Sequence, residues 1–250
     1  MRRGDDSHKA FEKKHQGDCS LMQDDLVLKV TDLGVELEGE RILDSLSFEV
    51  RRGDVLTILG PNGAGKTVLL KTLLGLLPHK GEISWKENIK ISYVPQRLPF
   101  IKDVPLSVKD FLQLKESFDM EKTEILDSIG FKELLFEKKV GDLSSGQFQR
   151  ILVAWSLIGN PQVLLFDEPT TGIDIEGEET VYKLLARLKR ERGLTILLVT
   201  HDLSVVYTFS NRVICLNRQP ICYGFPQEVL TPENLQRLYG EEVKYYRHKR

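Results

Sequence analysis

A glycine-rich segment at residues 60–67 constrains the fold of this chain more than any other feature of its sequence. It reads Gly-Pro-Asn-Gly-Ala-Gly-Lys-Thr, the pattern G-x-x-x-x-G-K-[ST], and it directly follows the apolar run 55–59. Glycine lets a loop curl until several backbone N–H groups point inward and form a nest for an anion. Residues 68–74 have helical character, and a helix N-terminus adds a partial positive charge. A strand, this loop and a helix in that order predict an α/β domain that binds the phosphates of a nucleotide.

Two side chains of this loop are suited to phosphate chemistry. Lys66 can reach the β- and γ-phosphates as a point charge, and the Thr67 hydroxyl can ligate Mg²⁺. The alternative is a chance glycine-rich turn, and the strand before it and the helix after it argue against that. We expect Lys66 to face phosphate rather than the core, so that its removal changes stability little. The predicted nucleotide-binding residues of the loop are Gly60, Pro61, Asn62, Gly63, Ala64, Gly65, Lys66 and Thr67.

Composition and charge narrow the class of protein. The chain has 250 residues, enough for one large domain or for a domain with a small inserted lobe. Its formal net charge is −2, from 35 basic and 37 acidic residues, so no overall field favours binding to nucleic acid. The N-terminal stretch lacks the apolar core of a secretory signal, and the longest apolar region, 151–166, is interrupted at 159–162 and is too short to span a membrane. We expect a cytosolic, soluble chain; if it serves a membrane process, it does so through partner subunits.

The three cysteines predict no metal site. Cys19, Cys215 and Cys222 show no C-x-x-C spacing, and their odd number fits a reducing compartment. Cys215 and Cys222 lie in apolar, strand-like segments, so we expect them to be small core residues.

Periodicity divides the chain into a polar extension at 1–25 and a large α/β domain after it. Residues 26–30 and 46–50 alternate as half-buried strands around a hairpin turn at 38–40, which predicts an N-terminal antiparallel β subdomain. Residues from 97 to about 145 switch to helical periodicity and predict an inserted α-helical subdomain. The alternation of further strands and helices implies a mostly parallel core sheet covered on both faces. These strands are predicted at 55–59, 81–85, 90–94, 163–166, 194–199 and 212–216, and the helices at 68–74, 147–159 and 176–192.

Two acidic residues end the apolar run 163–166. Asp167, at the tip of this predicted strand, is placed to hold Mg²⁺ directly or through water, and Glu168 can polarise an attacking water. The alternative is an acidic turn that only caps the strand. In a chain that also carries a phosphate loop, the functional interpretation is favoured.

The segment Leu143-Ser144-Ser145-Gly146-Gln147 discriminates most sharply among classes of nucleotide-binding protein. As a serine-rich turn that opens a helix, it is either a second anion site or an ordinary N-cap, and physical reasoning alone leaves both open. The segment resembles the L-S-G-G-Q signature of ATP-binding cassette (ABC) ATPases, and 23 residues separate Ser144 from Asp167, much as in that family.

Three further segments resemble ABC motifs and occur in the family's order. Residues 93–96 look like the Q-loop, 171–174 like the D-loop, and 200–202 like the switch histidine after the last core strand. The resemblance covers about residues 26–240 and leaves a basic tail at 241–250. It implies a P-loop NTPase fold and ATP as the nucleotide, and it argues against a P-loop kinase or GTPase.

The resemblance implies a role for each matching residue. Two copies of the chain would pair head to tail, with each ATP between the phosphate loop of one copy and the signature segment of the other. Glu168 would be the general base, His201 would contact the γ-phosphate, and Gln96 would couple metal and water to the transporter. Gln96 would join Thr67 and Asp167 in holding Mg²⁺. The remaining ATP-binding residues implied are Ser144, Ser145, Gly146, Gln147 and Asp174.

Two positions depart from the family pattern. Ser145 replaces the first glycine of the signature, and if that glycine is needed for a positive φ or for close approach to phosphate, Ser145 should weaken the ATP-closed dimer. Leu37 stands where the family usually stacks an aromatic ring on adenine, so apolar contact is kept and π-stacking is lost.

Sequence outside the nucleotide motifs resembles the ATPases of bacterial zinc and manganese importers. Residues 93–97 and 104–112 look like that group, and 213–230 with 238–240 look most like the ATPase of high-affinity zinc uptake. The resemblance implies polytopic permease subunits, a periplasmic or surface metal-binding protein acting indirectly, and a peripheral place on the cytoplasmic face of the bacterial inner membrane. The alternatives are a manganese or iron importer ATPase, or a soluble ABC ATPase acting on ribosomes or DNA. The soluble group usually carries two cassettes or a long insertion, and this chain has a single cassette with a compact lobe.

Overall fold

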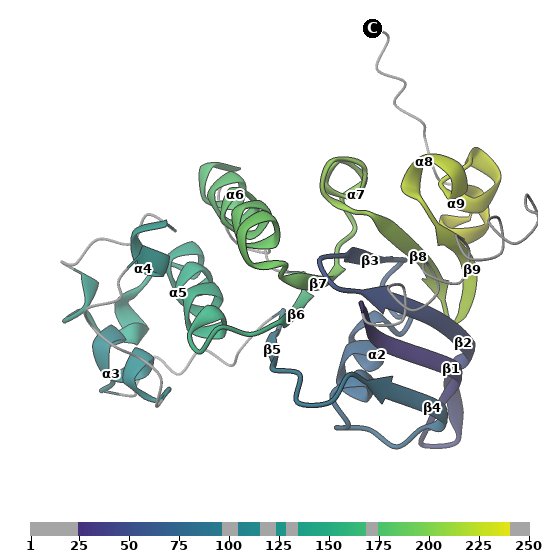
Figure 1. Ribbon diagram of the computed structural model, residues 1–250, viewed down its shortest axis with the longest axis horizontal. Coiled ribbons are helices and arrows are strands. Elements are labelled where there is room, and N and C mark those ends of the chain that lie inside the picture. Colours follow the sequence, from purple (N-terminus) through teal and green to yellow (C-terminus); the bar gives the residue numbers. More distant parts are fainter. Residues whose placement is uncertain (1–24, 97–104, 116–123, 129–134, 169–174, 241–250) are drawn as a thin grey trace, which may run out of the picture.

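The computed structural model describes residues 25–96, 105–115, 124–128, 135–168 and 175–240, and these residues build two β-sheets (Figure 1). The larger sheet has six strands in the order β5–β6–β7–β3–β8–β9, and the smaller has three in the order β2–β1–β4. The strands are β1 (Leu26–Leu37), β2 (Glu40–Arg51), β3 (Val55–Leu59), β4 (Lys80–Trp85), β5 (Ile91–Val94), β6 (Val163–Asp167), β7 (Thr195–Val199), β8 (Arg212–Asn217) and β9 (Gln219–Gly224). The helices are α2 (Lys66–Leu73), α3 (Val108–Gln113), α4 (Glu124–Ser128), η2 (Val140–Asp142), α5 (Ser145–Leu157), α6 (Ile175–Arg192), α7 (Leu203–Phe209), α8 (Pro226–Val229) and α9 (Pro232–Tyr239).

The six-stranded sheet is parallel except at its β9 edge, as the sequence predicted. β5, β6, β7, β3 and β8 run in one direction, and β9 returns antiparallel to β8. Successive side chains of a strand point to opposite faces. In β3, Leu56 and Ile58 pack with α2 and the smaller sheet, whereas Val55 packs with α5 and α6. Because both faces are covered, every residue of β3, β6 and β7 is buried.

The three-stranded sheet confirms the predicted antiparallel subdomain, but its strands are longer than predicted. β1 and β2 are joined at Glu38 and Gly39, whose φ angles of 52° and 80° suit a tight hairpin turn. The pairing of β1 with β2 shifts register several times, and Asp32 and Ser45 adopt left-handed φ angles of 49° and 48°. Such bulges interrupt the alternation of side chains. The period-two pattern therefore identified only the mutually paired ends of the two strands.

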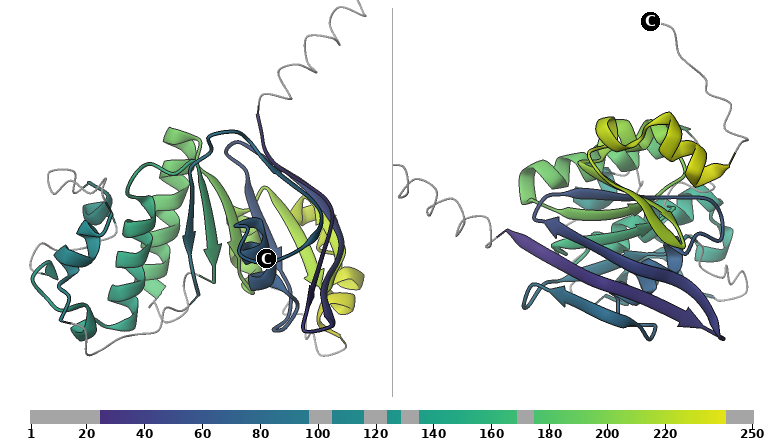
Figure 2. Two further views of the ribbon diagram at one scale, coloured as in Figure 1. Left: turned by 90° about the horizontal axis from the view of Figure 1, so that it is seen from below. Right: turned by 90° about the vertical axis from the view of Figure 1, so that its right-hand side faces the viewer.

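The helices lie in separate groups around the sheet (Figures 1 and 2). α3, α4 and α5 gather beyond β5 and β6, and α8 and α9 lie beside β8 and β9 at the other end of the molecule. α3 starts at a capping box in which Ser107 and Asp110 satisfy each other's backbone N–H groups. The predicted helical subdomain lies only partly within the described residues, and the extension at 1–25 and the tail at 241–250 lie almost entirely outside them. None of the helices in the described ranges is long and apolar enough to cross a membrane.

The two cysteines of the β8–β9 hairpin differ from the sequence prediction. Cys215 and Cys222 are direct partners in the antiparallel register and are joined by a disulfide bond. Both side chains are buried, as expected for core residues. Their pairing depends on the return of β9 beside β8, which neither the spacing nor the number of cysteines predicted.

Candidate active site

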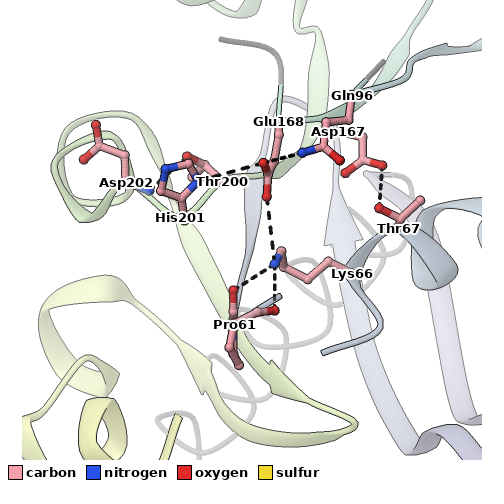
Figure 3. A network of polar contacts seen from close by, with 10 residues as sticks. Pro61, Lys66, Thr67, Gln96, Asp167, Glu168, Thr200, His201 and Asp202 are labelled. Atoms are coloured by element: carbon pink, nitrogen blue, oxygen red, sulfur yellow. Dashed lines mark hydrogen bonds and ion pairs between the residues drawn. The ribbon is translucent and has the colours of Figure 1, made fainter. Parts of the chain in front are cut away.

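The carboxyl ends of neighbouring parallel strands bring most of the predicted chemical groups together (Figure 3). β6, β7 and β3 are adjacent in the sheet, and the carboxyl ends of parallel strands meet at one edge. The phosphate loop follows β3, Asp167 and Glu168 end β6, and His201 follows β7. Gln96 follows β5, the neighbour of β6. Four segments that are far apart in sequence therefore converge on one site.

The phosphate loop adopts a backbone that depends on its glycines. Gly63 and Gly65 have φ angles of 79° and 95°, in the region that other residues rarely adopt. A Cβ atom at Gly65 would also lie 2.8 Å from Leu43 Cδ2, and one at Gly60 would lie 2.1 Å from the Leu216 carbonyl oxygen. The curled loop leads directly into α2, so its N–H groups and the helix N-terminus are arranged for an anion.

Lys66 lies deeper than the sequence suggested. Its side chain is only 7% exposed, and its Nζ donates to the carbonyl oxygens of Gly60 at 2.8 Å and Pro61 at 2.9 Å. Nζ also lies 3.9 Å from Glu168 Oε1. Burial lowers the pKa of the Lys66 ammonium, while the charges of Glu168 and Asp167 act in the opposite direction. The ammonium is thus held inside the loop, where a phosphate oxygen would compete with the two carbonyl oxygens for its hydrogen bonds.

Asp167 is a buried carboxylate held by two hydroxyl groups. It is 1% exposed, and its Oδ2 accepts hydrogen bonds from Thr67 Oγ1 at 2.8 Å and from Tyr93 OH at 3.4 Å. Burial raises the pKa of the Asp167 carboxyl, and the hydrogen bond from Thr67 opposes that shift. Burial and the charge of Asp167 both raise the pKa of Tyr93, which keeps its hydroxyl protonated as a donor. Tyr93 was not predicted as a site residue; its only signal in the sequence was its position in the segment that resembles the Q-loop.

Glu168 is the centre of the polar network. Its Oε2 accepts a hydrogen bond from Gln96 Nε2 at 2.7 Å and lies 3.9 Å from His201 Nδ1. Its backbone has a left-handed φ of 47°, and its N–H donates to the Val199 carbonyl oxygen. This conformation, which is costly for a residue with a side chain, ends the strand and turns the carboxylate toward the phosphate loop (Figure 3). His201 itself is 75% exposed, so it approaches Glu168 from the solvent side.

A cavity of about 320 Å³ lies between the phosphate loop and this network. Its lining suits a magnesium nucleotide: loop N–H groups and a lysine for phosphate, and for a hard cation the Thr67 hydroxyl, which is hydrogen-bonded to the buried Asp167 carboxylate. Two apolar lining residues, Ile42 from β2 and Val68 from α2, were not predicted. The lining residues are Ile42, Asn62, Gly63, Ala64, Gly65, Lys66, Thr67, Val68, Gln96 and Glu168.

The segment at residues 144–147 is not part of that cavity. Ser144 is the N-cap of α5: its Oγ accepts the Gln147 N–H at 3.2 Å, and Gln147 Oε1 accepts the Ser144 N–H at 3.0 Å. Both interpretations of the sequence therefore remain open, because a capped helix N-terminus can still present hydroxyls and N–H groups to an anion. Ser145 is the first residue of the helix, so a need for positive φ at this position is excluded. Asp174 lies outside the described residues.

Comparisons with known proteins show what the sequence and the fold of this chain are similar to. A family model described as ABC transporter matches residues 43–171, and an AAA-domain model matches residues 139–206. The chain is 40% identical to the zinc import ATP-binding protein ZnuC of Cereibacter sphaeroides, over 86% of this chain and 91% of the relative. It is 39% identical to ZnuC of Magnetococcus marinus, over 88% and 85%. Its fold is similar to cbiO1 from Clostridium perfringens, part of the ABC transporter complex cbiONQ, with a TM-score of 0.69, 28% identity and coverage of 85% of this chain and 94% of that one.

Proposed function

This chain belongs to the ABC transporter family, and we propose that it is the ATP-hydrolysing subunit of a bacterial importer for zinc. The observation that carries ATP hydrolysis is Glu168, which lies 3.9 Å from the phosphate-loop lysine and accepts a hydrogen bond from Gln96 beside the cavity. Zinc is supported by relatives that are named zinc import ATP-binding proteins and align with most of this chain. The transported ion need not contact the ATPase subunit.

The residues at the strand ends have different roles in hydrolysis. Loop N–H groups and Lys66 bind the phosphates, and the glycines keep the loop close to them. Thr67 and Asp167 would hold Mg²⁺, with Gln96 beside them. Mg²⁺, when bound, neutralises charge on the phosphate oxygens. Glu168 orients a water molecule and accepts its proton on a carboxylate oxygen. Its position suits this role, because one carboxylate oxygen faces Lys66 and the other faces Gln96 and His201.

A second copy of the chain would complete the site. The α5 N-terminus at Ser144–Gln147 carries the signature sequence but does not line the cavity of its own chain. We propose a head-to-tail homodimer in which this N-terminus from one copy faces the phosphates bound by the other. The hydroxyls and N–H groups of a helix start favour an anion there. Asp174, which lies outside the described residues, stays a predicted ATP-binding residue.

We place this dimer on the cytoplasmic face of the inner membrane, bound to polytopic permease subunits. The similarity to cbiO1, which is part of a transporter complex, supports an assembly of this kind. A periplasmic or surface protein that binds the metal would act through the permease.

Two measurements test the proposal. The purified chain should bind ATP and should hydrolyse it when assembled with a permease; a chain that binds no ATP would refute the enzymatic part. A strain that lacks the gene should grow poorly in zinc-limited medium and recover with added zinc. Recovery with manganese or iron and not with zinc would overturn the choice of metal while leaving the ATPase assignment intact.

A further inference from the structure

The Tyr93 hydroxyl contacts Asp167 but has no role in the mechanism above. Tyr93 lies in β5 and pairs with Leu165 of β6, two residues before Asp167. Its ring is half-buried and packs against the apolar cluster between the two sheets. The strand pairing and the packing of the ring place the hydroxyl 3.4 Å from Asp167 Oδ2.

Two hydroxyl donors from different elements converge on the same carboxylate oxygen. Thr67 reaches Asp167 Oδ2 from the start of α2, and Tyr93 reaches it from β5. Among the described residues, none donates a hydrogen bond to the other oxygen, Oδ1. Two donors on one oxygen restrict rotation of the carboxylate about its last torsion, and that torsion is otherwise broad.

Only the contact from Tyr93 is independent of the metal and the nucleotide. Thr67 is itself expected to face Mg²⁺, so its position must adjust when the metal binds. Tyr93 lies on a strand of the sheet and has no such second task. When a residue does not touch the metal but orients a side chain that does, its mutation typically lowers metal affinity by 10- to 100-fold. We expect a smaller effect where the orienting hydrogen bond is long.

We propose that Tyr93 is a positioning residue whose hydroxyl orients the Asp167 carboxylate for Mg²⁺, so that the nucleotide binds more tightly as its magnesium complex. This inference rests on the proposed function, because it assumes that Asp167 faces a metal–nucleotide complex. It assigns Tyr93 no contact with ATP.

The test compares Tyr93→Phe with the wild type and with Tyr223→Phe. Phenylalanine keeps the ring and removes only the hydroxyl. Tyr223 is a matched control, because its hydroxyl also donates to an oxygen, the Glu49 carbonyl at 2.9 Å, but outside the cavity. For each protein, the dissociation constant of a fluorescent mant-ATP is measured once in EDTA and once in excess Mg²⁺.

In Tyr93→Phe, the gain in affinity that Mg²⁺ provides should fall by about three- to tenfold, the range of one hydrogen bond. Affinity in EDTA should stay within about twofold of wild type, since a hydroxyl that touches no phosphate has no reason to change it. The Tyr223→Phe control should match wild type in both conditions.

An unchanged gain from Mg²⁺ in Tyr93→Phe would overturn the inference, and so would a variant that fails to fold, because the hydroxyl would then serve stability. A wild-type chain that does not bind mant-ATP at all would instead refute the proposed function. The two failures are therefore distinguishable.

Discussion

Replacement of Glu168 by glutamine is the sharpest test of the assignment of the general base. The amide has the shape of the carboxylate and can still accept the hydrogen bond from Gln96 through its oxygen. It cannot accept a proton from water. Loss of a positioned base commonly lowers the rate by 10²- to 10⁴-fold, which corresponds to about 3–5 kcal/mol in the activation free energy.

The same substitution should strengthen ATP binding. Glu168 lies 3.9 Å from the Lys66 ammonium and would place a negative charge near bound phosphates. At that distance and an effective dielectric constant of about 20, two unit charges interact by about 4 kcal/mol. Removal of the carboxylate removes its attraction for the Lys66 ammonium in the free protein. In the ATP-bound protein it removes the repulsion between the carboxylate and the phosphates. Both effects favour ATP, so we expect affinity to rise at least severalfold and an ATP-bound dimer to accumulate.

The assay is steady-state phosphate release by the assembled transporter, together with gel filtration of the isolated subunit in ATP. Glu49→Gln is a matched control. Glu49 also lies 3.9 Å from a lysine, Lys29, but in the three-stranded sheet and outside the cavity. That variant should behave as wild type. Turnover of Glu168→Gln within about threefold of wild type would refute the assignment, because a positioned base is worth far more than that.

Two other substitutions and the reduction of a disulfide test separate parts of the structure. Lys66→Ala should abolish most ATP binding or turnover and should lower the free energy of unfolding by about 1–2 kcal/mol in chemical denaturation, because one buried and one partly buried hydrogen bond from Nζ are lost; unchanged stability would contradict the observed burial. Ser145→Gly should modestly increase the dimer fraction at each ATP concentration in a Glu168→Gln background, because a Cβ at the helix start is removed; a weaker dimer would show that the serine contributes a contact. Reduction of the Cys215–Cys222 disulfide, which closes a loop of sequence separation 7, should lower the free energy of unfolding by about 2.5 kcal/mol; a double serine variant should show no response to reductant, and equal stability of the oxidised and reduced wild type would contradict the prediction.

Local sequence was sufficient for the parts of the protein that depend on neighbouring residues. Gly63 and Gly65 predicted the phosphate loop because the loop's own backbone needs a positive φ at both positions, whereas Gly60 is required by the close approach of the Leu216 carbonyl oxygen from β8. The apolar run 163–166 predicted a buried strand, and the acidic pair after it predicted polar groups at a strand end. The alternation of strands and helices predicted a parallel sheet covered on both faces, because only such a sheet buries strands of this kind. The resemblance to ABC ATPases assigned Gln96 and His201, which periodicity could not.

The tertiary structure decided what depends on strand order and on packing between distant segments. The strands do not lie in chain order, so only the fold shows that the ends of β5 and β7 bring Gln96 and His201 to Glu168 at the end of β6. The burial of Lys66, the hydrogen bond from Tyr93 to Asp167 and the disulfide between adjacent strands have the same origin. Periodicity in a sequence reports which face of an element is apolar, whereas a hydrogen bond between side chains requires two elements to be placed within a few ångströms, and that placement is set by the whole core.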